Sequence, residues 1–315
     1  MFEVKTPEFQ NIKGWINSKP LTLKQLKGKV VLLDFWTYSC INCLRTLPHI
    51  KQIYEKYKKY KFILIGVHTP EFDFERISEN VKKAVKDLEI KYPVALDSDN
   101  ITWHIYGNRY WPKQTLIDAR GRIKYGHVGE GGYKEIEENI VKLLKENGEE
   151  INFKISHDQE FIPGFNISPE TYAGSLRNNG IGNGALCVPG SCNHYIDPSK
   201  YELNVIYLDG DWIQDKEYLK HAGKKGSLIF KYNAHSINAV LVPDKKPFEA
   251  IVYLDNKYLT KENSSKDVRF HGKISYVKVT KPNLYELTKI KNIEQHTLKL
   301  ETISKDFKLY AFTFG

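Results

Sequence analysis

Two cysteines separated by two residues, Cys40 and Cys43, are the side chains in this sequence best suited to covalent chemistry. They follow an apolar run beginning at Val30, which is typical of a buried parallel strand. Ser39 stands where a helix N-cap is expected, so Cys40 is predicted to lie in the first turn of a helix. A helix N-terminus stabilises a thiolate, and Cys43 would lie on the same helix face, close enough for a disulfide.

Asp34 stands six residues before Cys40, inside the otherwise apolar run. Burial of a carboxyl group raises its pKa towards the range that is useful for proton transfer. We therefore interpret Asp34 as the proton acceptor for Cys43. A Cys-x-x-Cys pair can also bind zinc, but a strand before the pair and an amphipathic helix after it favour redox chemistry.

The segment that contains both cysteines resembles the thioredoxin superfamily, its redoxin (TlpA-like) branch, and the soluble C-terminal part of DipZ-type proteins. It runs from Trp36 to Pro48 and reads Trp-Thr-Tyr-Ser-Cys-Ile-Asn-Cys-Leu-Arg-Thr-Leu-Pro. The resemblance covers residues 1–150. It implies a thioredoxin-like α/β domain, with a central mixed sheet flanked by helices, that needs no cofactor and no metal.

The same resemblance implies thiol–disulfide exchange as the activity. Cys40 would form a mixed disulfide with a protein substrate, and Cys43 would resolve it. The intervening Ile41-Asn42 carries no basic group to stabilise the thiolate strongly, which favours a reductant of protein disulfides over an oxidant. The expected partners are a protein disulfide or dithiol and an upstream electron donor.

Trp111 and Pro112 precede another apolar run, where proline marks the start of a strand because it cannot donate to a ladder. In the thioredoxin superfamily the corresponding proline is cis and faces the disulfide. The resemblance therefore implies that Trp111 and Pro112 line a substrate cleft, and we add Tyr38, from the turn before Cys40, as a substrate-binding candidate. The alternative for Trp111 is an ordinary core aromatic.

A second buried strand is predicted over residues 62–67, and His68-Thr69-Pro70-Glu71 follows it. A helix start explains this segment, with Thr69 as the N-cap and Glu71 in the first turn. The same string recurs in DipZ-like sequences, which makes His68 and Glu71 further candidates for substrate binding.

Residues 146–150 are the expected linker, so the sequence predicts domains at 1–150 and 151–315. The second part contains short segments of β-type composition separated by turn signals such as Asp209-Gly210. They indicate an all-β sandwich, in particular a jelly roll, which in DipZ-type proteins is similar to a carbohydrate-binding module. The predicted strands are residues 203–208, 228–232, 237–242, 250–254, 268–270, 274–279, 296–300 and 308–314.

The sandwich also suggests a glycan as a possible ligand. Tyr172, Tyr195 and Trp212 could stack on a sugar ring, although aromatic residues in a sandwich more often belong to its core.

Cys187 and Cys192 enclose a Pro-Gly turn, and we expect them to form a structural disulfide. Free thiols are the first alternative, and a metal site with His194 is the second, with no fourth ligand nearby.

The formal charge of +9 is spread over both halves of the chain, and no basic cluster is interleaved with aromatics as a nucleic-acid groove requires. No partner of that kind is expected. The hydrophobic runs are too short to span a bilayer, and the N-terminus lacks the apolar core of a secretory signal. We therefore expect a cytoplasmic location, with an extracytoplasmic one as the alternative if the sequence is a piece of a longer protein.

Two other classes of function compete with disulfide exchange. A peroxiredoxin-like thiol peroxidase is suggested by Thr37-x-x-Cys40, half of the motif Pro-x-x-x-Thr-x-x-Cys, but Leu33 occupies the proline position. Arg45 or Arg109 would supply the positive charge there. A glycan-binding or partner-binding protein with a merely regulatory disulfide is the third class.

Overall fold

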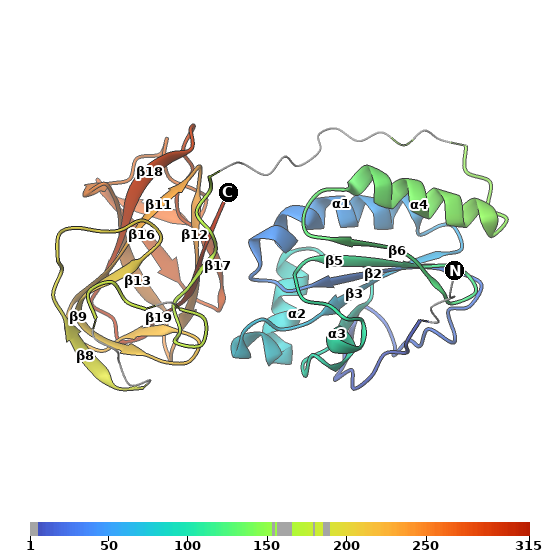
Figure 1. Ribbon diagram of the computed structural model, residues 1–315, viewed down its shortest axis with the longest axis horizontal. Coiled ribbons are helices and arrows are strands. Elements are labelled where there is room, and N and C mark those ends of the chain that lie inside the picture. The colour runs from blue at the N-terminus through green and yellow to red at the C-terminus, as the bar shows by residue number, and fades with distance from the viewer. Residues whose placement is uncertain (1–5, 153–154, 156–165, 179, 185–189) are drawn as a thin grey trace. The chain divides into compact units, whose positions relative to one another are not determined.

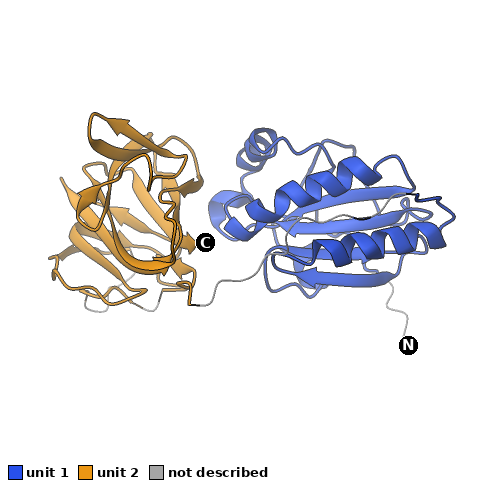
Figure 2. Ribbon diagram, turned by 90° about the horizontal axis from the view of Figure 1, so that it is seen from above, with its two compact units in different colours: residues 1–163 blue, residues 164–315 orange. Residues whose placement is uncertain are grey.

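The computed structural model describes residues 6–152, 155, 166–178, 180–184 and 190–315. The chain forms two compact units, residues 1–163 and 164–315 (Figure 2). The sequence placed this division at residue 150, and most of residues 151–165 lie outside the described part. In the described part, no helix has the length and apolarity needed to cross a membrane.

The first unit is a mixed sheet with helices on both faces (Figure 1), which confirms the predicted thioredoxin-like fold. Its described strands follow the order β1-β4-β3-β2-β5-β6, with β2 parallel to β3 and antiparallel to β5. The elements are β1 (Trp15–Ile16), β2 (Val30–Trp36), α1 (Ile41–Tyr57), β3 (Phe62–His68), the 3₁₀ helix η1 (Asp73–Arg76), α2 (Ser78–Asp87), β4 (Val94–Leu96), α3 (Ile101–Ile105), β5 (Lys113–Ile117), β6 (Ile123–Val128) and α4 (Tyr133–Glu146).

Strand β2 is buried along its whole length because helices cover both faces of the sheet (Figure 1). Side chains alternate between the faces. Phe35 packs on the side of α3, where its ring centroid lies 6.0 Å from that of Trp103. Asp34 therefore points to the opposite face, which α1 and α4 cover (Figure 1).

The second unit is an all-β sandwich whose described strands pair antiparallel (Figure 1). Each of the eight predicted segments overlaps a strand, and the five strands that the sequence missed have only two to four residues, too few to show alternation. The strands are β7 (Thr171–Tyr172), β8 (Cys192–Tyr195), β9 (Ile206–Gln214), β10 (Leu219–His221), β11 (Gly226–Ala234), β12 (Ile237–Pro243), β13 (Phe248–Leu254), β14 (Lys257–Tyr258), β15 (Val268–His271), β16 (Ile274–Val279), β17 (Asn283–Glu286), β18 (Glu294–Thr302) and β19 (Phe307–Phe314).

The turn expected at Asp209-Gly210 is wrong, because β9 continues through it. Gly210 has φ +87°, and a Cβ there would lie 2.6 Å from the Lys225 carbonyl oxygen, so only glycine fits. Before this point β9 pairs with β11, and after it β9 pairs with β8 and β10. The glycine bends the strand where it changes partners, as strands do at the corners of sandwiches.

Two of the three proposed sugar-stacking residues belong to the core. Tyr195 is 3% exposed and Trp212 is 0% exposed, and the Trp212 indole N–H donates to the Asp209 carbonyl oxygen at 2.9 Å. Their rings therefore have no surface to offer to a sugar, and that part of the prediction is wrong. Tyr172 is half-buried, and the Arg177 guanidinium lies 3.7 Å from its ring centroid.

The predicted disulfide between Cys187 and Cys192 falls partly outside the described residues, because Cys187 is not among them. Cys192 is exposed on β8. His194, the candidate metal ligand, places Nδ1 2.7 Å from Asp211 Oδ1. Within the described ranges, no group of three or more His, Cys, Asp or Glu side chains is arranged to hold a metal ion.

Candidate functional site

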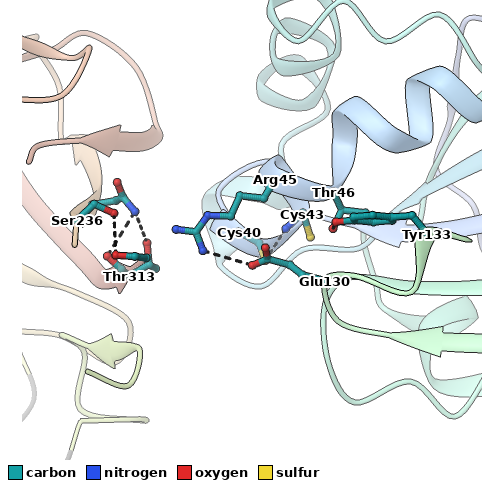
Figure 3. A network of polar contacts seen from close by, with 10 residues as sticks. Cys40, Cys43, Arg45, Thr46, Glu130, Tyr133, Ser236 and Thr313 are labelled. Carbon is teal, nitrogen blue, oxygen red and sulfur yellow. Dashed lines mark hydrogen bonds and ion pairs between the residues drawn. The ribbon is translucent and has the colours of Figure 1, made fainter. Parts of the chain in front are cut away.

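Cys40 and Cys43 lie at the start of α1 (Figure 3). Cys40 is itself the N-cap, and its sulfur accepts the Cys43 backbone N–H at 3.5 Å. The prediction of Ser39 as the cap is wrong because the Ser39 hydroxyl donates to a buried carboxylate, Glu75 Oε1, at 2.7 Å. Both cysteines are free thiols, with Cys40 half-buried and Cys43 only 4% exposed. Cys40 is thus the sulfur that a substrate can reach.

The two thiols differ in acidity. Burial, followed by the neighbouring Cys40, raises the pKa of the Cys43 thiol well above its ordinary value. Cys43 therefore remains protonated at neutral pH and needs a proton acceptor before it can attack a disulfide.

Asp34 has the properties of that acceptor. Its side chain is 3% exposed, and burial raises its pKa to about 7, while a hydrogen bond from Gln114 opposes the rise. Gln114 lies directly opposite Asp34 in the pairing of β2 with β5, and its Nε2 donates to Asp34 Oδ1 at 2.8 Å. The negative charge of Asp34 is also one cause of the raised Cys43 pKa, so the two groups interact electrostatically.

The Trp111–Pro112 peptide bond is cis, as the family resemblance implied, and Pro112 is buried and immediately precedes β5. The Gly129 backbone N–H donates to the Pro112 carbonyl oxygen at 2.8 Å. Trp111 is half-buried and stacks on Trp103, with 4.1 Å between ring centroids. One face of the Trp111 ring therefore packs on the core. Substrate binding by the rest of the ring stays a prediction.

Two of the other three candidates for substrate binding are buried. Tyr38 and His68 are 2% and 1% exposed and stack on each other, with ring centroids 5.6 Å apart. Burial lowers the pKa of His68 to about 3, so its imidazole is neutral. Glu71 is half-buried. Direct contact with a substrate is thus open to Glu71 but not to Tyr38 or His68 without rearrangement.

The helix start predicted at Thr69 is wrong. The Thr69 hydroxyl donates to the buried Asp97 Oδ2 at 3.2 Å instead of capping a helix. The first helical turn after β3 is η1, and α2 begins only at Ser78.

Of the residues suggested for a peroxidase-type site, Arg45 and Thr37 both contact carboxylates. Arg45 Nη1 lies 3.3 Å from Glu130 Oε1, and the Glu130 side chain is 5% exposed (Figure 3). Thr37, the threonine of the partial peroxidase motif, donates its hydroxyl proton to Glu75 Oε1 at 2.5 Å. Arg109 is exposed.

Two residues in this site were missed by sequence reasoning. Gln114 could be assigned only from the register of β2 with β5, which local composition does not reveal. Glu75 is 0% exposed, yet it lies in a segment with charged neighbours that reads as solvated surface. No local signal distinguishes it.

Comparisons with known proteins agree with this geometry. Residues 3–126 match the AhpC/TSA family, and residues 168–315 match a thioredoxin like C-terminal domain family. Protein DipZ of Mycobacterium tuberculosis is 37% identical over 241 residues, which are 75% of this chain and 34% of DipZ. The chain thus spans about a third of the length of DipZ.

Two shorter relatives are matched over most of their length. Thiol-disulfide oxidoreductase ResA of Bacillus thuringiensis is 32% identical over 128 residues, 41% of this chain and 71% of ResA. Thiol-disulfide oxidoreductase YkuV of Bacillus subtilis is 28% identical over 141 residues, 44% of this chain and 94% of YkuV. The chain therefore belongs to the thioredoxin-like redoxin family of thiol-disulfide oxidoreductases.

Proposed function

We propose that this protein reduces disulfides in protein substrates through the Cys40–Cys43 dithiol. The observation that carries the proposal is the pairing of an accessible thiol with a buried one at a helix N-terminus. The Cys40 sulfur accepts the Cys43 backbone N–H, a contact that stabilises a thiolate. Cys43 is buried, and its thiol is the group that would attack the mixed disulfide in the second step.

The reaction has two displacements. The Cys40 thiolate attacks one sulfur of the substrate disulfide, which breaks the substrate S–S bond and releases one substrate thiolate that takes up a proton. Cys43 then gives its proton to Asp34, and its thiolate attacks the Cys40 sulfur of the mixed disulfide. The second substrate sulfur leaves as a thiolate and takes up the proton held by Asp34, which returns to its ionised form. The substrate has gained two electrons and two protons, and the protein holds a Cys40–Cys43 disulfide that an upstream dithiol donor must reduce.

Local charge supports reduction as the physiological direction. A strong oxidant needs its reduced thiolate to be strongly stabilised. Ile41 and Asn42 carry no charge, and Arg45, the nearest cation in sequence, is paired with Glu130. Stabilisation of the Cys40 thiolate is therefore left to the helix N-terminus.

Trapping of the mixed disulfide tests the proposal. The Cys43→Ser variant lacks the resolving thiol, so we expect it to accumulate a covalent adduct with a model protein disulfide such as insulin. Mass spectrometry should locate the adduct on Cys40. Cys40→Ser is the matched control and should form no adduct. Adducts mainly on Cys192, or equal adducts in both variants, would contradict the assignment.

The competing functions have less support. A thiol peroxidase would use the threonine of its motif beside the peroxidatic cysteine. In this protein that threonine, Thr37, donates its hydroxyl proton to Glu75. A glycan ligand, the jelly-roll topology and the cytoplasmic location all stay predictions. For the glycan, Tyr172 is the remaining candidate, with one ring face already against Arg177.

A further inference from the structure

A single buried carboxylate joins two turns beside the dithiol. Glu75 Oε1 accepts the Thr37 hydroxyl at 2.5 Å, the Ser39 hydroxyl at 2.7 Å and the Ser39 N–H at 3.3 Å. Glu75 Oε2 accepts the backbone N–H groups of Glu71 at 2.7 Å and Phe72 at 3.1 Å. All five interactions direct a donor at the carboxylate.

The two turns leave the same edge of the sheet. β2 and β3 are parallel neighbours, and their last residues, Trp36 and His68, are paired. The first turn, residues 37–39, leads directly into Cys40. The second follows β3 and leads into η1. Glu75 thus connects the turn that leads into Cys40 to the turn that follows β3.

Local helix capping explains only half of this arrangement. Phe72 is the N-cap of η1, and Glu75, the third helical residue, accepts the Phe72 backbone N–H, which is the carboxylate half of a capping box. That role accounts for Oε2. It does not account for Oε1, whose three donors lie more than thirty residues earlier in the chain, next to Cys40.

The network favours an ionised Glu75. Three of its five donors are backbone N–H groups, which can only donate. The Thr37 hydroxyl has one proton, and since that proton points to Glu75, the contact of His68 Nε2 with Thr37 Oγ1 at 3.3 Å requires His68 to donate. Burial and the nearby Glu71 raise the pKa of Glu75 to about 7, and the hydrogen bonds oppose that rise.

We propose that Glu75 is a positioning residue for disulfide exchange: it fixes the turn of Thr37 and Ser39 so that the Cys40 sulfur stays at the N-cap of α1. There the Cys43 N–H and the helix N-terminus stabilise the Cys40 thiolate. This inference rests on the proposed function. It concerns the reactivity of the Cys40 thiol, however, which can be measured without any turnover.

The Glu75→Gln variant tests it. Glutamine keeps the size of the side chain, but its NH₂ group must face donors on one side of the network, so at least one turn is released. We expect the alkylation of Cys40 by iodoacetamide at pH 7 to slow about threefold to tenfold, because less of the thiol is held as the reactive thiolate. Peptide mass spectrometry of the full chain separates Cys40 from Cys43 and Cys192. Glu79→Gln, at an exposed position on α2, is the matched control and should leave the profile unchanged.

The sign of the change decides between two roles. If Glu75 acted only as a nearby negative charge, its removal would favour the Cys40 thiolate and speed alkylation. Either that result or an unchanged profile would overturn the positioning role.

Smaller changes keep the test valid if Glu75→Gln does not fold. Ser39→Ala and Thr37→Val each remove one hydroxyl donor and should slow Cys40 alkylation less, in the same direction. Where Glu75→Gln folds, adding Ser39→Ala to it should cause little further change, because both act through one interaction. If the double variant slowed alkylation by the full product of the two single effects, Glu75 and Ser39 would act independently, and the proposed interaction between them would be contradicted. Absence of insulin reduction by the unmodified protein would contradict the proposed function, while the alkylation profile would still decide the role of Glu75.

Discussion

Replacement of Asp34 by Asn is expected to slow the release of reduced substrate from the mixed disulfide by about a hundredfold or more at neutral pH. Asparagine retains an oxygen that can accept the hydrogen bond from Gln114 Nε2, but it cannot take the proton of Cys43. Cys43 then has to lose its proton to water from a buried site. Single-turnover, quenched-flow measurement of product release isolates this step from the first attack by Cys40.

The pH dependence of the resolution step is the control for this prediction. Asp34 must be ionised to accept a proton, so resolution should be slow below pH 7 and should accelerate as pH rises through its pKa of about 7. Asp34→Asn should lack that step. Gln114→Leu removes the hydrogen bond that lowers the Asp34 pKa, so the step should move to higher pH. Identical profiles for the wild-type protein and Asp34→Asn would exclude Asp34 as the acceptor.

The Asp34→Asn substitution should also stabilise the first unit in alkaline solution. The folded pKa of Asp34, about 7, lies above the ordinary value of 3.8, so the folded chain holds a proton that the unfolded chain loses. The free energy of unfolding therefore falls as pH rises between these two values, by about 4 kcal/mol in total. The Asp34→Asn variant avoids this cost because its amide carries no charge at any of these pH values. Hydrogen exchange of β2 peptides should show extra protection in Asp34→Asn at pH 8 and little at pH 4, whereas equal protection at both would contradict burial of the charge.

Replacement of Trp212 by Ala is expected to destabilise the second unit by about 3–5 kcal/mol. The indole is 0% exposed, packs edge-on against Phe307 with ring centroids 5.5 Å apart, and donates to the Asp209 carbonyl oxygen. Its removal leaves a large cavity and takes away this hydrogen bond at the point where β9 changes partners. Hydrogen exchange of β9 and β11 peptides, or denaturant unfolding, measures the loss.

Ile303→Ala is the control for this cavity, because that side chain is 76% exposed and its removal should cost little. A loss below about 1 kcal/mol for Trp212→Ala would contradict the core position of the indole.

The parts of the site that sequence could predict are those specified by short segments. The apolar run of β2, the Cys40–Cys43 spacing and a carboxyl group inside a buried strand are all local patterns, and the fold and family followed from them. Side-chain burial then places Asp34 and Cys43 as expected.

The two wrong helix starts share one cause, competition from distant partners. Ser39 and Thr69 each have the residue type of an N-cap, but buried carboxylates, Glu75 and Asp97, take their hydroxyl groups instead. Gln114 meets Asp34 only through strand register. Contacts between residues far apart in the chain decide these positions, and a single sequence does not contain them.

The central claim, that Cys40 and Cys43 form a reducing dithiol couple, is tested most directly by their equilibrium redox potential. Thiol labelling in dithiothreitol and glutathione buffers measures it, with Cys43→Ser as the control that cannot form the couple. We predict one two-electron transition at about −250 mV or lower, in the range of thioredoxin. A value near −120 mV would contradict the reducing direction. Absence of a two-electron transition would contradict the dithiol mechanism itself.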